Sequence, residues 1–269
     1  MSALVFATGP VHLDEDGDDL RADLGEALSH ALDAHIEVRA ETSYAALRER
    51  VLAREIALAW LPPALYVKTQ RAGAIGAVLR AERLAGASYQ GAIFVREDSA
   101  LRSASDLAGK RVAWVDPDSC AGYLFPRLAL RAAGIDPDGC FASETFLESH
   151  SLVVGAVASG TCDAGATHVQ LADASEPSKG LAIAGWTAFA EASSMRAIVV
   201  SPSIPSDAVC IGAAVPGEVR EKWRVALGSV HGQPSMSLLL RAMLGVDRLT
   251  PGAPDDYAPV RDALAAEGD

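Results

Sequence analysis

The chain has 269 residues, half of them hydrophobic, and a formal net charge of −12 at pH 7. This acidic balance argues against nucleic-acid binding, which needs a basic surface, and no apolar run reaches the roughly 18 residues of a membrane-spanning helix. The four cysteines, at positions 120, 140, 162 and 210, lack the close spacing of a zinc site. We therefore expect buried thiols, no metal site and no cofactor.

The first third of the chain alternates between strand-like and helical segments. Short apolar runs predict strands at residues 4–8, 36–40, 56–61 and 74–79. Between them, apolar residues at helical spacing predict helices at residues 20–32, 44–53 and 63–71. This alternation is typical of a parallel sheet covered by helices.

The same rhythm restarts after Tyr89. Strands are expected at residues 91–96, 111–115, 141–146, 163–167, 181–186 and 196–201, with helices at 119–133 and 150–159. Residues 208–215 then open a tail that we expect to be helical at 218–230, 235–244 and 255–266. We predict two lobes, 1–88 plus 208–269 and 89–207, joined by chain crossings near 87–91 and 203–208.

One strand-to-helix junction has the features of an anion site. The strand at residues 111–115 ends at Asp116-Pro117, and Ser119 is a favourable N-cap for the helix that follows. The small residues Ala121 and Gly122 leave the first-turn N–H groups open, and a helix N-terminus attracts anions. These residues alone fit an ordinary capped junction equally well.

A wider set of motifs favours the anion site. Residues 115–126, VDPDSCAGYLFP, resemble the VDPxSxSGYxxP stretch of the phosphate/phosphonate-type substrate-binding proteins of bacterial ABC importers. Further stretches resemble that family in the same order, at residues 42–47, 57–62, 149–150, 156–166 and 204–207. The resemblance spans about the whole chain. It implies an α/β protein with a two-lobed, type II periplasmic-binding-protein-like fold, each lobe a mostly parallel sheet covered by helices, with a ligand cleft between the lobes.

The resemblance also implies how a small phosphonate, phosphate or other oxyanion would bind. Nine ligand-binding residues are expected: Tyr44, Tyr89, Ser119, Cys120, Ala121, Gly122, His150, His168 and Asp207. The turn at residues 119–122 and His150 would hold the acidic group, and Tyr44, Tyr89 and Asp207 would close over the rest. His168 follows the strand at 163–167, and α/β ligands sit at such carboxyl ends.

Two departures from the family pattern bear on the ligand. Cys120 and Ala121 stand where the family usually has hydroxyl residues, and each lost hydrogen bond to an anion is worth roughly 1.5–3 kcal/mol. Gln170 stands, by spacing, where aminoalkylphosphonate binders have a glutamate, which leaves Asp207 as the one carboxylate for an amine. An aminoalkylphosphonate is therefore a poor first guess. We also expect Cys120 to lie open in the cleft, where a helix N-terminus would make its thiol reactive.

The first interpretation is a monomeric solute-binding protein, not an enzyme, with an ABC permease as its possible partner. The alternative is a cytoplasmic ligand sensor or a small-molecule enzyme on the same fold, such as the menaquinone-pathway dehydratases. The first residues lack the pattern of a signal peptide. The protein would be cytoplasmic if Met1 is the native start, and periplasmic if a leader was removed.

Overall fold

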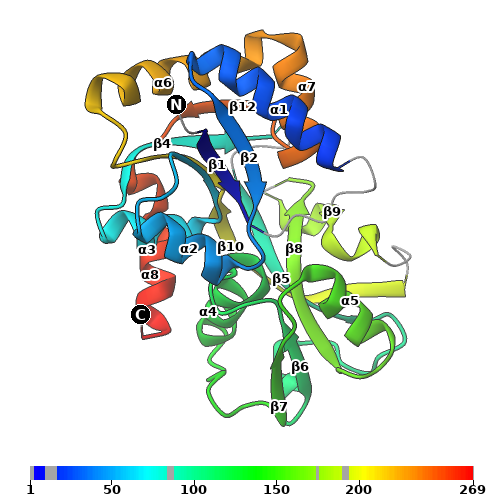
Figure 1. The fold of residues 1–269 in the computed structure, drawn as a ribbon. Coiled ribbons are helices and arrows are strands. Elements are labelled where there is room, and N and C mark those ends of the chain that lie inside the picture. The colour runs from blue at the N-terminus through cyan, green and yellow to red at the C-terminus, as the bar shows by residue number, and fades with distance from the viewer. Residues whose placement is uncertain (1–2, 10–16, 84–87, 174–175, 190–193, 269) are drawn as a thin grey trace. The chain divides into compact units, whose positions relative to one another are not determined.

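A computed structural model describes residues 3–9, 17–83, 88–173, 176–189 and 194–268, and its elements are labelled in Figure 1. The chain divides into two compact units: unit 1 comprises Met1–Ala87 and Pro205–Ala258, and unit 2 comprises Ser88–Ile204 and Pro259–Asp269. Part of the expected first crossing, at Ala87, lies outside the described residues.

Unit 1 contains a six-stranded sheet in the order β12-β4-β11-β3-β1-β2. The strands are β1 (Leu4–Thr8), β2 (Ile36–Ala40), β3 (Leu58–Leu61), β4 (Ile75–Glu82), β11 (Ala208–Gly212) and β12 (Arg248–Pro251). β1 runs parallel to β2 and β3, whereas β11 is antiparallel to both β3 and β4. β12 adds a second antiparallel strand beside β4.

Alternating side chains of this sheet are buried under helices on its two faces. The helices are α1 (Gly17–Leu32), α2 (Tyr44–Leu52), α3 (Pro63–Arg71), α6 (Gly217–Ser229) and α7 (Pro234–Leu244). In Figure 1, α1, α6 and α7 gather on one side of the sheet, with α2 and α3 on the other. Leu58 and Trp60 join the core under α1, α6 and α7. Leu61, the next residue of β3, points to the opposite face, because side chains alternate along a strand.

Unit 2 contains a second sheet in the order β10-β5-β8-β6-β7, with β9 paired to β8 off this path. Its strands are β5 (Ser88–Arg96), β6 (Arg111–Trp114), β7 (Ser143–Phe146), β8 (Ala164–Leu171), β9 (Leu181–Ala184) and β10 (Met195–Pro205). β6 is parallel to β7 and β8, and β5 is antiparallel to β8.

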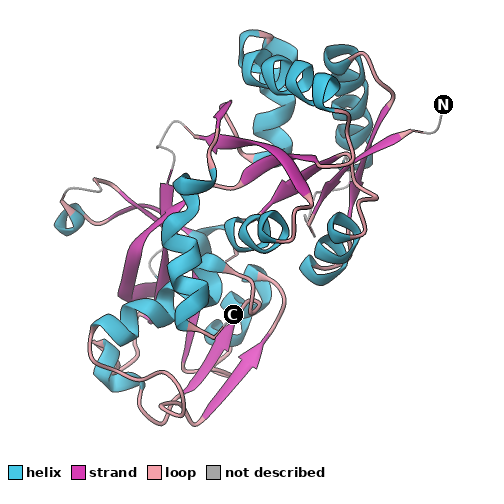
Figure 2. Cartoon of the chain, turned by 90° about the vertical axis from the view of Figure 1, so that its left-hand side faces the viewer, coloured by secondary structure: helices cyan, strands magenta, loops and turns pink. Residues whose placement is uncertain are grey.

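Helices α4 (Phe125–Ala132) and α5 (His150–Ala158) flank the unit 2 sheet. Figure 2 colours the helices of the chain cyan and the strands magenta. One face buries Phe94 and Ala113 with Val153 of α5, and the other buries Ile93 and Trp114 with apolar residues that include Leu130 of α4. The predicted α/β class, with two helix-covered sheets, is confirmed. The sheets are mixed and not mostly parallel as expected, because β11 and β12 join the unit 1 sheet antiparallel and β5 and β9 pair antiparallel with β8. No helix in the described part of the chain is long and apolar enough to cross a membrane.

The structure corrects two expectations about the tail. The tail is not wholly helical, because β11 and β12 insert into and extend the unit 1 sheet. Residues 259–269 group with unit 2, although we assigned residues 208–269 to the first lobe. The physical reason lies at the end of α8 (Ala258–Ala266), where Glu267 forms ion pairs with Arg127 and Arg131 of α4.

Candidate functional site

Two loops and one strand of unit 2 come together at one edge of its sheet. Because β6, β7 and β8 run parallel, their carboxyl ends lie at the same edge. β6 leads to Ser119 and β7 leads to His150, while Thr167 and His168 in the middle of β8 lie level with the end of β6, because Ala113 pairs with Gly165. Ligands of α/β proteins bind beyond such carboxyl ends. The fold therefore brings the turn at residues 119–122 (the candidate turn), His150 and His168 to one place within unit 2.

The turn before α4 is tied together by its own polar groups. The Asp118 N–H donates to Asp116 Oδ1 at 2.7 Å, and the Ser119 N–H donates to the Asp116 carbonyl at 2.9 Å. Ser119 Oγ then accepts the Gly122 N–H at 3.0 Å, which makes Ser119 the N-cap that the sequence predicts. The helix begins, however, with a π-helical turn, Cys120–Leu124, in which the Leu124 N–H donates to the Ser119 carbonyl at 3.0 Å.

Gly122 has a different role from the one expected. Its N–H is occupied by Ser119 Oγ, so in this conformation it is closed to a ligand. A Cβ at Gly122 would lie 2.4 Å from Val115 Cγ2, and a Cβ at Gly91 would lie 2.7 Å from the Ala121 carbonyl oxygen. Both glycines therefore allow the turn to pack closely onto the sheet. That the N–H groups of Cys120 and Ala121 meet a ligand stays a prediction.

The turn is also more buried than the sequence suggests. Cys120 is 2% exposed and Ser119 is 8% exposed, whereas Cys140 is partly accessible. The expectation that Cys120 lies open is therefore wrong, because the π-helical turn Cys120–Leu124 packs onto β5 and β8. None of the four cysteines, which all fall within the described ranges, forms a disulfide.

His150 is placed by an unusual backbone conformation. Glu148 has a φ of 62°, a left-handed value that few residues other than glycine adopt. Its N–H donates to the Val115 carbonyl at 2.7 Å, which ties the loop after β7 to the end of β6. Ser149 then caps α5 by accepting the Leu152 N–H at 3.1 Å. His150 consequently stands at the first position of α5.

The His150 ring is held between two side chains of β8. Its Nδ1 lies 2.9 Å from Thr167 Oγ1, and its ring lies edge-on to His168 with centroids 5.0 Å apart. Removal from water, reinforced by the charge of His168, lowers the pKa of His150 to about 3. In the ligand-free protein His150 is therefore neutral at pH 7, and the neutral ring can offer an anion one N–H donor.

The remaining unit 2 candidates lie on strands. His168 is within β8, which continues to Leu171, and not beyond the strand as the sequence suggests. Tyr89 is near the start of β5, which runs antiparallel to β8 with Gly91 opposite His168. The start of β5 therefore lies at the carboxyl end of β8, on the same edge as His150. Both side chains are half-buried.

Tyr44 and Asp207 belong to unit 1, where they share the corresponding edge. Tyr44 opens α2, and its ring lies against Gly9, where an added Cβ would be 2.6 Å from Tyr44 Cε1. Asp207 precedes β11, whose first residue pairs with Leu61 at the carboxyl end of β3. The Asp207 carboxylate accepts from Arg83 Nη2 at 3.1 Å, so its charge is already balanced within unit 1.

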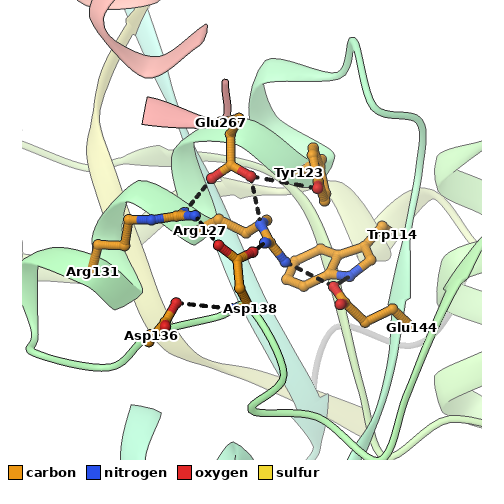
Figure 3. A network of polar contacts seen from close by, with 8 residues as sticks. All are labelled: Trp114, Tyr123, Arg127, Arg131, Asp136, Asp138, Glu144 and Glu267. Atoms are coloured by element: carbon orange, nitrogen blue, oxygen red, sulfur yellow. Dashed lines mark hydrogen bonds and ion pairs between the residues drawn. The ribbon is translucent and has the colours of Figure 1, made fainter. Parts of the chain in front are cut away.

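A polar network fixes the helix that follows the candidate turn (Figure 3). Arg127 of α4 has a side chain only 3% exposed, and its Nη1 donates to Glu144 at 2.8 Å while its Nε donates to Glu267 at 2.9 Å. Its third nitrogen pairs with Asp138, and its guanidinium lies 5.0 Å from the centre of the Tyr123 ring. Because Tyr123 belongs to the turn Cys120–Leu124, the network supports the candidate turn from the side.

Sequence reasoning missed the supporting residues of this site. Thr167, Glu148 and Gly185 carry no motif of their own, and each matters through a neighbour distant in the chain. The described residues contain no group of three or more histidine, cysteine or carboxylate side chains arranged to hold a metal ion.

Comparison with known proteins identifies the family. A family model described as "ABC transporter, phosphonate, periplasmic substrate-binding protein" matches residues 6–257. The chain belongs to this family. The resemblance inferred from the motifs is thereby confirmed, and the matched segment contains all nine candidate residues.

Individual known proteins resemble this chain in sequence or in fold. The phosphate-import protein PhnD of Mycolicibacterium smegmatis is 29% identical over 179 residues, which are 62% of this chain and 56% of that protein. PhnD1 of Prochlorococcus marinus, solved with methylphosphonate, covers 99% of the chain with a TM-score of 0.80 and 16% identity. XAC2383 of Xanthomonas citri, solved with ATP, covers 98% with a TM-score of 0.77 and 17% identity.

Membership of the phosphonate-binding family also decides between the two functional interpretations. Its members are substrate-binding proteins of transporters and not enzymes. The prediction that the chain is not an enzyme is confirmed on that ground, and the dehydratase-like alternative is not favoured. The family's description names an ABC transporter as the setting in which its members act.

Proposed function

We propose that the protein captures a small phosphonate- or phosphate-like anion at the carboxyl edge of the unit 2 sheet and delivers it, as a monomer, to an ABC permease. The observation that carries this proposal is the convergence of the Ser119 turn and the neutral His150 at one edge. Both supply hydrogen-bond donors, and the Asp116 carboxylate beside the turn already accepts the Asp118 N–H at 2.7 Å.

The net charge of the chain does not oppose an anionic ligand. Charges separated by more than the Debye length of ~8–10 Å are largely screened, whereas N–H dipoles act at hydrogen-bond distance. The proposed donors are Ser119 Oγ, the N–H groups of Cys120 and Ala121, and the His150 ring. Cys120 and Ala121 add no hydroxyl donor, so we expect weaker binding than a three-hydroxyl loop would give.

The rest of the ligand would meet the other candidates. Tyr44, Tyr89 and His168 are proposed contacts for a small organic substituent. The Asp207 carboxylate already forms an ion pair with Arg83, whose Nη2 lies 3.1 Å from Asp207 Oδ2. We therefore propose that Asp207 contacts only a neutral polar group of the ligand. A ligand carrying an ammonium group is therefore disfavoured, since Gln170 cannot replace a carboxylate.

Calorimetry on paired variants tests the proposal. Wild-type protein should bind methylphosphonate or inorganic phosphate, and Ser119→Ala combined with His150→Ala should weaken the affinity at least roughly 100-fold, since each bond to a charged group is worth about 1.5–3 kcal/mol. His30→Ala, on the exposed face of α1, is the matched control and should bind normally.

Melting curves must accompany that titration, because Ser119 also caps the turn and its loss costs about 1 kcal/mol of stability. Unchanged affinity in a folded double variant would refute the proposed site.

A further inference from the structure

Thr167 has a buried hydroxyl whose hydrogen bonding is unusually restricted. The residue is 0% exposed in the middle of β8. Within the described part of the chain, its Oγ1 has one hydrogen-bond partner, His150 Nδ1, at 2.9 Å. A hydroxyl has one proton to donate, and a buried proton without an acceptor lowers stability.

This restriction determines which His150 nitrogen carries the proton. If Nδ1 were protonated, it would donate to Oγ1, and the Thr167 proton would be left buried without an acceptor. If Nδ1 is unprotonated, Thr167 donates to it and both groups are satisfied. A neutral imidazole has one N–H, so the second arrangement places that proton on Nε2.

Gly185 provides the space for this arrangement. A Cβ at position 185 would lie 2.6 Å from Thr167 Oγ1 and 2.9 Å from His168 Cε1. Any larger residue would have to displace the hydroxyl or the neighbouring ring. Thr167 and His168 belong to β8, and Gly185 opens the short turn Gly185–Ala188 that follows β9.

We propose that Thr167 is a positioning residue that fixes His150 in its Nε2–H tautomer, so that Nε2 can donate to a bound oxyanion, and that Gly185 is required to leave room for this pair. The ligand-binding half of this inference rests on the proposed function. The tautomer half stands without any ligand.

The tautomer is measured directly by long-range proton–nitrogen NMR on protein labelled with ¹⁵N-histidine, with the His150→Gln variant used to assign the signals. We expect His150 of the ligand-free protein to show a protonated Nε2 and an unprotonated Nδ1. Thr167→Val, which keeps the shape but removes the hydroxyl, should give a mixture of tautomers. Thr167→Ser should retain the wild-type spectrum. A protonated Nδ1 in the wild-type protein would overturn the proposal.

The consequence for binding is measured by titrating methylphosphonate and inorganic phosphate into the same variants. Thr167→Val should weaken affinity roughly three- to tenfold, Thr167→Ser should bind like the wild type, and Gly185→Ala should weaken binding with a shift of the His150 signals. Equal affinity of the valine and serine variants would refute the positioning role. If neither anion binds the wild-type protein, the proposed function fails, while the tautomer result remains a separate test of the Thr167 pairing.

Discussion

Three neighbouring residues determine the position and the environment of the His150 ring. Glu148, in its left-handed conformation, directs the chain into α5, Thr167 fixes one ring nitrogen, and His168 approaches the ring edge-on. The low pKa of His150 is a consequence of this packing, because a charged imidazolium would lose its water and face a second histidine. A neutral donor at this position is suited to recognise an oxyanion without depending on pH in the neutral range.

The pKa of His150 predicts a specific loss of stability in acid. The folded-state pKa of about 3 lies below the ordinary value of 6.5, so between these values the unfolded chain binds a proton that the folded chain does not. Stability from this group is therefore complete above pH 6.5 and declines as the pH falls toward 3. At pH 5 the expected loss is about 2 kcal/mol.

Urea unfolding of the wild type and of His150→Gln at pH 7.5 and pH 5 measures this loss. The glutamine variant cannot titrate, so it should lose about 2 kcal/mol less than the wild type between the two pH values. Parallel losses in the two proteins would mean that His150 titrates normally.

At the scale of single elements, the segment from the candidate turn to α4 depends on a distant partner. Arg127 is nearly buried, and one of its carboxylate partners, Glu267, is 140 residues away and only 10% exposed. The same carboxylate also pairs with Arg131. The end of α8 thus stabilises the helix that carries the candidate turn.

Replacing this one carboxylate should be costly. Glu267→Gln keeps the shape but leaves Arg127 and Arg131 with one negative charge fewer, and we expect a loss of about 1–3 kcal/mol in the free energy of unfolding. Glu221→Gln breaks an exposed ion pair with Arg224 on α6 and should leave unfolding unchanged within error. Equal behaviour of the two variants in urea unfolding would show that the Glu267 contacts add nothing to stability.

The elements differ in how far the sequence predicts them. The long apolar or amphipathic runs that become β1, α1, β6 and α5 are predicted to within a few residues, because burial enforces their periodicity. β12 was missed because only Leu249 of its four residues is buried, so it has almost no pattern to detect. The π-helical start at Cys120–Leu124 was missed because its conformation follows from packing of the turn onto Val115 and β5.

At the scale of the whole molecule, the occurrence of several family-like motifs in the family's order was more informative than any single motif. Together they indicated the family and the two α/β units, whereas the assignment of residues 259–269 failed because it depends on one long-range ion-pair network. Ser119 and His150 were predictable as candidates from the motifs. Thr167 and Gly185 were not, since their importance comes from three-dimensional neighbours that the sequence does not place.

The family of this chain consists of substrate-binding proteins, and the proposed ligand site lies at one edge of the unit 2 sheet. A binding protein of this family must hold its ligand strongly enough to capture it and release it to the permease, which suits a site made of neutral donors. The proposal thus predicts both the class of ligand and the residues that meet its acidic group.

A crystal structure of the protein grown with methylphosphonate tests this central claim most directly. The proposal predicts phosphonate oxygens within hydrogen-bond distance, about 2.6–3.2 Å, of His150 Nε2, Ser119 Oγ and the Ala121 N–H. A phosphonate bound away from these three groups, or an empty site at saturating methylphosphonate, would contradict it.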